Sequence, residues 1–158
     1  MNMFHKKRFT DTEIIKTQQK VRRFVFLHIV LPILVGGILY LFFCPDVFFV
    51  KKVDDILNIS RNENVLKESV LGEMIRNYLF DIVWAYSLTN TLLIICGRDR
   101  KSKRIAIVIA ALMSIGMELL QLMECIGGTF DIVDVLVEIV AVFVAFLAYK
   151  YCLEKTNE

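Results

Sequence analysis

Four stretches of mostly apolar residues, each about twenty residues long, dominate this chain of 158 residues. A helix needs roughly 20 apolar residues to cross the hydrocarbon of a bilayer. The stretches that qualify are residues 24–44, 78–96, 105–123 and 131–150. Hydrophobic residues make up 56% of the sequence and the charges gather between the stretches, which is not the composition of a soluble domain. The sequence therefore predicts an all-α integral membrane protein folded as a four-helix bundle.

The distribution of Lys and Arg predicts the orientation of these spans, because basic residues resist translocation. The arm 1–23 and the loop 97–104 are rich in Lys and Arg, so both are expected in the cytoplasm. The loop 45–77 has no basic excess and the turn 124–130 has no Lys or Arg, so both are expected outside. The tail 151–158 then lies in the cytoplasm with the N-terminus. The first span is expected to be an uncleaved anchor, since it is too long for a signal peptide.

Short helices are also predicted outside the spans. A capping box at Thr10–Glu13 indicates a helix leading into the first span. A second capping box at Ser60–Glu63 precedes apolar residues at helical spacing from Val65 to Ile75. This pattern predicts an external amphipathic helix, either a simple surface helix or a lid over an outward-facing cleft.

Acidic and amide side chains occur inside or beside three of the four spans. A charged side chain there costs about 2.5 to 3.5 kcal/mol on insertion scales, so such residues rarely lie in a span without a role. Helical spacing places the acidic residues of the last span on one face. The predicted orientation places the acidic and amide side chains of all three spans in the outer half of the bundle. The sequence therefore predicts an outward-facing intramembrane site formed by Asp81, Glu118, Gln121, Asp131, Asp134 and Glu138.

Some of these residues have structural explanations as well. Asp131 and Asp134 stand at the start of a helix, where acids cap free N–H groups and favour the helix dipole. Gln121 can simply hydrogen-bond across helices. Glu118 and Glu138 have no cation at their depth on these helices. Unless a basic residue from outside the span, such as Arg76, reaches down to them, they must be protonated, hydrated or bound to a cationic ligand.

Polar and small residues of the first two spans carry weaker signals. His28 is expected to be solvated or bonded to the backbone. Pro32 and the pair Gly36-Gly37 predict a kink or a close helix contact. Tyr86, like its neighbour Trp84, is typical of an anchor at the membrane interface.

The motif Glu118-x-x-Gln121 followed by Gly128-Thr129-Phe130-Asp131-Ile132-x-Asp134-Val135 resembles the VanZ-like family of small multi-pass bacterial membrane proteins. The resemblance covers residues 77–149, and the start of the second span resembles a sister group of uncharacterised membrane proteins. Thr129 stands where the family usually has Arg, and Glu138 and Ala141 stand for its usual Asn and Gly. The resemblance implies a multi-pass protein of the bacterial cytoplasmic membrane and names no reaction.

Three functions remain open. One is a non-enzymatic cell-envelope component whose outer carboxylates bind a cationic or lipid-linked ligand. Another is a membrane-embedded enzyme for a lipid-linked substrate, with carboxylates as metal ligands or acid and base, although the sequence shows no nucleophile–base pair, His cluster or Arg clamp. A bacteriocin-type immunity protein is the third. The lipid bilayer is the expected surrounding of this chain. No cofactor, assigned metal or nucleic-acid partner is expected, and the oligomeric state is open.

The predicted orientation can be tested by labelling single cysteines in intact cells. An impermeant maleimide should modify a cysteine placed at Asn62 or Gly127 and should spare one placed at Ser102, because only the first two positions are predicted to face outward. Permeabilised cells provide the control, since all three positions should then react. The reverse pattern in intact cells would overturn both the orientation and the outward-facing site.

Overall fold

We describe the protein from a computed structural model, which covers residues 11–43, 48–58, 74–96, 99–123 and 131–154. These ranges contain helices and no β-strand. In chain order the elements are α1 (Asp11–Val25), η1 (Phe26–Val30), α2 (Leu31–Phe43), α3 (Phe48–Leu57), η2 (Ile75–Leu79), α6 (Phe80–Cys96), α7 (Arg100–Leu122), α8 (Ile132–Tyr149) and η3 (Lys150–Glu154). The three η elements are single π-helical segments.

Within the described ranges, four helices are long and apolar enough to cross a membrane: Thr12–Phe43, Asn77–Cys96, Arg100–Leu122 and Ile132–Glu154. The predicted all-α membrane fold is thereby confirmed. Which side each loop faces, and where the arm, spans, loops and tail meet the membrane surface, stay predictions.

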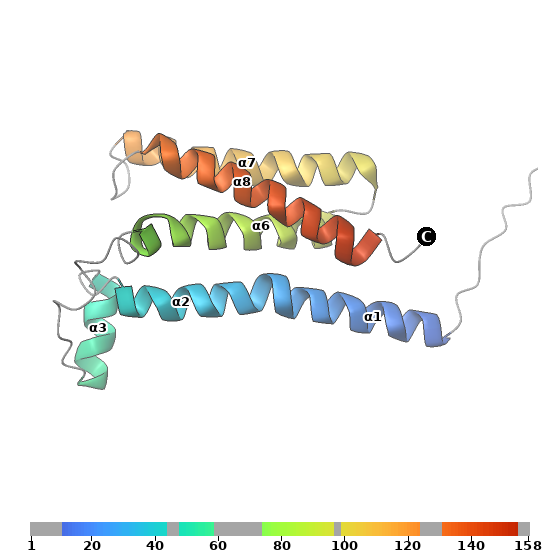
Figure 1. The fold of residues 1–158 in the computed structure, drawn as a ribbon, viewed down its shortest axis with the longest axis horizontal. Coiled ribbons are helices and arrows are strands. Elements are labelled where there is room, and N and C mark those ends of the chain that lie inside the picture. The colour runs from blue at the N-terminus through green and yellow to red at the C-terminus, as the bar shows by residue number, and fades with distance from the viewer. Residues whose placement is uncertain (1–10, 44–47, 59–73, 97–98, 124–130, 155–158) are drawn as a thin grey trace, which may run out of the picture.

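The first helix does not break between the basic arm and the first span. α1, η1 and α2 follow one another without a gap and form one long rod (Figure 1). At 1.5 Å per residue, the 32 residues of Thr12–Phe43 extend about 48 Å, which exceeds the roughly 30 Å of bilayer hydrocarbon. The capping box predicted a separate helix in the arm; in the structure that helix and the span are one element.

Helix α6 occupies the centre of the bundle. It contacts α2 and η1 of the first rod on one side and α7 and α8 on the other, and α7 and α8 also contact each other (Figure 1). The sequence of α6 suits this place, because its buried residues are spread around the helix and all but Leu93 are small or polar: Ala85, Ser87, Thr89, Asn90 and Leu93. Such residues let neighbouring helices approach closely in lipid.

Helices α7 and α8 each bury one stripe. The buried residues of α7 recur every four residues and are Ala106, Ala110, Ser114 and Glu118. The buried residues of α8 also share one face and are Glu138, Ala141, Val142 and Ala145. Large apolar side chains cover the opposite faces and remain exposed, as expected for helices that face lipid. The small residues thus bring the two acidic helices together.

Asp99 fixes the start of α7. Its Oδ2 accepts hydrogen bonds from the backbone N–H groups of Lys101 and Ser102 at 3.0 and 3.2 Å, and its Oδ1 accepts one from the Ser102 hydroxyl. These hydrogen bonds, led by the one from the Ser102 side chain, hold the pKa of the Asp99 carboxyl below its usual range. The helix begins at Arg100, inside the segment predicted as the loop 97–104, because this cap satisfies its first N–H groups.

Part of the predicted outer loop is helical. α3 crosses the direction of α2 at the end of the first rod (Figure 1), and its Val50 is fully buried. It is followed by Asn58 with a φ of 51°, a left-handed conformation that Asn tolerates at helix ends. Most of the predicted amphipathic helix between Val65 and Ile75 lies outside the described residues, and so does the turn 124–130.

Gly36 marks the closest approach of α2 to α6, and Gly37 offers a matched control. A Cβ added at Gly36 would lie 3.0 Å from Cγ1 of Val83, whereas one added at Gly37 would meet nothing within 4 Å. We expect Gly36→Val to lower the free energy of unfolding by about 1 to 3 kcal/mol through overpacking. Gly37→Val should change it by less than about 0.5 kcal/mol. Unfolding in mixed micelles measures both, and equal losses would contradict the contact.

Candidate functional site

Four carboxylates from three helices converge between α6, α7 and α8. Asp81 comes from α6, Glu118 from α7, and Asp134 and Glu138 from α8. Asp81 lies near enough to Asp134, Glu118 and Glu138 to repel their charges, and Glu118 and Asp134 repel each other as well. We call these four residues the carboxylate cluster. Residues that are far apart in the sequence thus form one acidic lining.

The deepest members of the cluster are shielded from solvent and have unsatisfied oxygens. Glu118 and Glu138 are each only 2% exposed, while Asp81 and Asp134 are half-buried. Glu118 Oε2, Asp134 Oδ1 and Glu138 Oε2 are buried without a hydrogen-bond partner. Of the Lys and Arg side chains that the structure describes, none acts on any of the four carboxylates; the side chain of Arg76, a candidate partner from the sequence, lies outside that described set. A buried unpaired polar group costs about 1 to 3 kcal/mol, so the cluster is incomplete as an internal network.

Uncharged polar groups extend the cluster along α6 and α7. Ser114 lies beside Glu138, and the hydroxyl oxygens of Ser87 and Ser114 and the Oδ1 of Asn90 are also buried without partners. Neither Ser87 nor Asn90 belongs to the site predicted from the sequence. The signal for them was the polar run at residues 87–91, of which Thr89 and Thr91 bond only to backbone carbonyls four residues earlier on the same helix.

Asp131 has a structural role at the start of α8. Its Oδ1 accepts a hydrogen bond from the backbone N–H of Val133 at 2.9 Å, which is the N-cap interaction. Its backbone and its charge both lie close enough to Glu118 to act on that carboxylate, so the start of α8 lies beside α7. Gln121 is half-buried nearly one turn beyond Glu118. These two residues therefore flank the cluster, and Asp131 adds its charge to the rim.

The carboxylates do not form a coordination shell. Across the parts of the chain that the structure describes, no three His, Cys, Asp or Glu side chains are close enough together to hold a metal ion. The spacing instead gives a loose acidic lining with several free oxygens on different helices. Such a lining attracts a diffuse positive charge and offers it more than one acceptor.

The environments of His28 and Tyr86 differ from their predictions. His28 is half-buried, and its Nδ1 lies 2.6 Å from the Tyr86 hydroxyl oxygen, so its side-chain partner is another side chain and not the backbone. Tyr86 is therefore not an interfacial anchor but joins α6 to η1. The sequence missed this pair because the two residues are 58 positions apart and neither belongs to a motif. Trp84 is exposed and faces the first rod.

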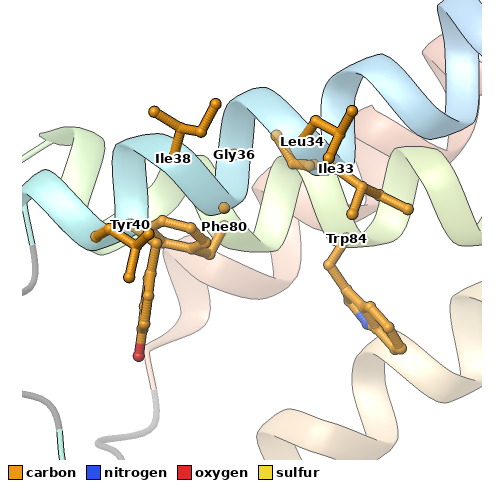
Figure 2. A pocket seen from close by; sticks show the side chains of 10 residues that line it. Ile33, Leu34, Gly36, Ile38, Tyr40, Phe80 and Trp84 are labelled. Carbon is orange, nitrogen blue, oxygen red and sulfur yellow. The ribbon is translucent and has the colours of Figure 1, made fainter. Parts of the chain in front are cut away.

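A second concave surface lies between α2 and α6, away from the carboxylates. It is a groove of about 540 Å³ lined mainly by apolar side chains of both helices, including Ile33, Leu34, Ile38, Phe80 and Trp84 (Figure 2). Gly36 and Gly37 form part of its floor because they carry no side chain. The groove contains no charged residue and suits a hydrocarbon chain, not a cation.

Neutralising Glu138 without changing its shape should stabilise the bundle at neutral and alkaline pH. In Glu138→Gln the repulsion from three neighbouring carboxylates disappears, so we expect the free energy of unfolding at pH 8 to rise by about 1 to 3 kcal/mol. The stability of the wild-type protein should fall more steeply with rising pH than that of the variant, because deprotonation adds like charges. Thermal unfolding between pH 5 and 9 measures this.

Glu154→Gln is the matched control for that variant. Glu154 forms an ion pair with Lys103 and lies outside the cluster, so its neutralisation should not stabilise the protein. A loss of stability in Glu138→Gln would show that the Glu138 carboxylate has an attractive partner.

Comparison with known proteins gives one result that covers nearly the whole chain. Residues 8–153 match the profile of the family described as VanZ/LLP1. No curated protein and no solved structure matches the chain. The match includes the first rod and the loop 45–77, whereas recognisable motifs occur only within residues 77–149. With four membrane-crossing helices and a match of this extent, the chain belongs to the VanZ/LLP1 family as a multi-pass membrane protein.

Proposed function

We propose that this protein is a non-enzymatic component of the bacterial cell envelope that binds a cationic group at the carboxylate cluster. The observation that carries the proposal is the set of buried, unpartnered carboxylate oxygens on α7 and α8, on which none of the Lys and Arg side chains that the structure describes acts. A charge in such a place is expected to pair with a ligand when the protein offers no partner. The cation is then a missing member of the site.

Its position along the helices supports an outward-facing site in the cytoplasmic membrane. Asp81 is near the start of α6, Glu118 near the end of α7 and Asp134 near the start of α8, so all three lie at the same end of the bundle. The basic start of α7 lies at the other end, where Arg100, Lys101 and Lys103 favour the cytoplasm. A cation would therefore enter from the outer surface.

The spacing of the cluster favours an organic or monovalent cation. A tightly bound divalent ion needs several oxygens converging at 2.0 to 2.6 Å from one point. The described carboxylates do not converge in this way. An amine, free or as part of a lipid headgroup, can instead donate hydrogen bonds to oxygens on different helices. An amine-bearing group is therefore the class of ligand that the site fits best.

Ligand-dependent thermal stability tests this function. We would titrate the purified protein in detergent with ethanolamine, potassium or magnesium at constant ionic strength. Ethanolamine should raise the unfolding temperature, since a ligand at 100 times its Kd stabilises by about 2.7 kcal/mol. For a chain of this length that corresponds to a rise of roughly 5 to 11 °C. Glu118→Gln and Glu138→Gln should abolish the rise, while Glu154→Gln should keep it.

Two results would contradict the proposal. If no cation changes the unfolding temperature, the carboxyl groups are neutral members of the bundle and the site is structural. If magnesium alone stabilises the protein, and Glu118→Gln and Asp134→Asn both abolish the effect, the membrane-embedded metal enzyme becomes the better explanation.

A further inference from the structure

A second group of chemically active side chains lies away from the carboxylate cluster, where the first rod meets α6 and η3. Cys152 Sγ lies 3.8 Å from Nε2 of His28, and Nδ1 of the same ring lies 2.6 Å from the Tyr86 hydroxyl. The three residues come from η3, η1 and α6. A thiol, an imidazole and a hydroxyl thus lie in a continuous row. The thiol and the imidazole form a nucleophile–base pair that the sequence did not reveal.

The geometry is that of a thiol with a base and an orienting group. A nucleophile is activated when a base lies within hydrogen-bonding reach and a third group holds the base in position. With Nδ1–H donating to Tyr86, Nε2 of His28 is free to accept the thiol proton of Cys152. Tyr86 is then a positioning residue that selects the reactive tautomer of His28.

Aromatic packing and local backbone geometry hold the imidazole in place. Phe24 stacks on His28 with ring centroids 4.5 Å apart and meets Tyr149 edge-on. His28 and Cys152 each lie in a π-helical segment, and Pro32 follows η1 directly after Leu31. Pro32 cannot donate to the carbonyl of His28 and clashes with it, which explains the wider turn at this point. π-Helical turns of this kind are frequent at functional sites.

An apolar groove adjoins this row of three side chains at Tyr86. It has a volume of about 360 Å³, lies on the seam between α6 and α8, and includes Tyr86, Val140 and Val144 in its lining. Along α8, Cys152 is eight residues from Val144 and twelve from Val140, or about 12 and 18 Å at the helical rise. The groove is therefore within the length of a hydrocarbon chain attached at Cys152.

Basic side chains surround η3. Lys20 donates to the backbone oxygen of Leu153, Lys103 lies 5.9 Å from the centre of the Tyr149 ring and pairs with Glu154, and Lys150 is exposed. Positive charge beside a thiol at the end of a span suits a donor that carries phosphate groups. Half-buried Cys152 is thus placed between lipid and a basic surface.

We propose that Cys152 is an acylation site that accepts a fatty-acyl group from a phosphate-bearing thioester such as an acyl-coenzyme A. The thiol proton passes to Nε2 of His28 while Sγ attacks the thioester carbonyl. A new bond forms between Sγ and the acyl carbon, the carbon–sulfur bond of the donor breaks, and the departing thiolate takes the proton from His28. No oxidant or reductant is required. This site is independent of the carboxylate cluster and of its proposed ligand.

Cys96 provides a matched control, because it is also a free, half-buried cysteine at the end of a span. Two single-cysteine proteins would be compared: one retains Cys152 and the other retains Cys96, with the remaining cysteines changed to Ser. After incubation with hexadecanoyl-coenzyme A, intact-protein mass spectrometry should show acylation of the Cys152 protein at least about tenfold faster. Hydroxylamine should remove the group, as it does from thioesters.

His28→Gln separates chemistry from structure, since Gln can still hydrogen-bond to Tyr86 but cannot take a proton. We expect it to slow acylation by about 100-fold, a common contribution of a general base. Tyr86→Phe should slow it less, because its role is to position the ring. Thermal unfolding of each variant shows whether the fold is retained. If a variant does not fold, the comparison of the Cys152 and Cys96 proteins still tests the proposal, because both proteins keep His28 and Tyr86.

The pH dependence of alkylation gives a readout that a structural role would not change. The iodoacetamide rate of Cys152 should level off once the imidazole of His28 is neutral and able to accept the thiol proton, whereas the rate of an unassisted thiol continues to rise toward about pH 8.5. The other titratable groups around the chain are Lys20 of α1, Lys103 of α7, Tyr149 of α8 and Glu154 of η3. Equal acylation rates for Cys152 and Cys96, or an unchanged rate in His28→Gln, would overturn the proposal.

Discussion

The cost of placing charge in lipid decides how the last three helices pack. A charged side chain that faced hydrocarbon would cost about 2.5 to 3.5 kcal/mol, and an unsatisfied polar group adds to that cost. α6, α7 and α8 can keep their acidic residues only if these point toward one another. The stripes of Ala and Ser allow this, because they let the helix backbones approach closely enough to shield Glu118 and Glu138. The packing that shields the carboxylates also leaves their oxygens without protein partners, which creates the site.

The first rod is attached by different contacts. Large apolar side chains cover its part from Phe26 to Phe42, and few of the rod's residues are buried. It is fixed to α6 by the contact of Gly36 with Val83 and by the hydrogen bond of His28 with Tyr86. A few polar contacts are enough to fix the position of the rod along α6, because in lipid no water competes for the same hydrogen bonds. The rod therefore forms one wall of the groove between α2 and α6 and does not enter the carboxylate cluster.

The two sites differ in how far the sequence predicts them. Asp81, Glu118, Asp134 and Glu138 follow from helical spacing and from the charge bias of the loops, because acids are conspicuous in an apolar segment. Ser87 and Asn90 were missed because weakly polar residues are common in membrane helices and carry little signal. The contacts of His28 with Tyr86 and Cys152 could not be predicted, since they join three distant segments and depend on the rotation of each helix.

By itself, the sequence determined that this chain crosses a membrane as helices, how many spans it has, and which spans carry acids. Those properties depend on composition and on periods of three to four residues, which are local. Only the tertiary structure decided that the first rod continues unbroken from the arm, that α6 is central, and that a thiol, an imidazole and a hydroxyl meet where η1, α6 and η3 come together. The reason is that helix rotation and tilt in lipid are set by packing between neighbouring helices, which no single segment encodes.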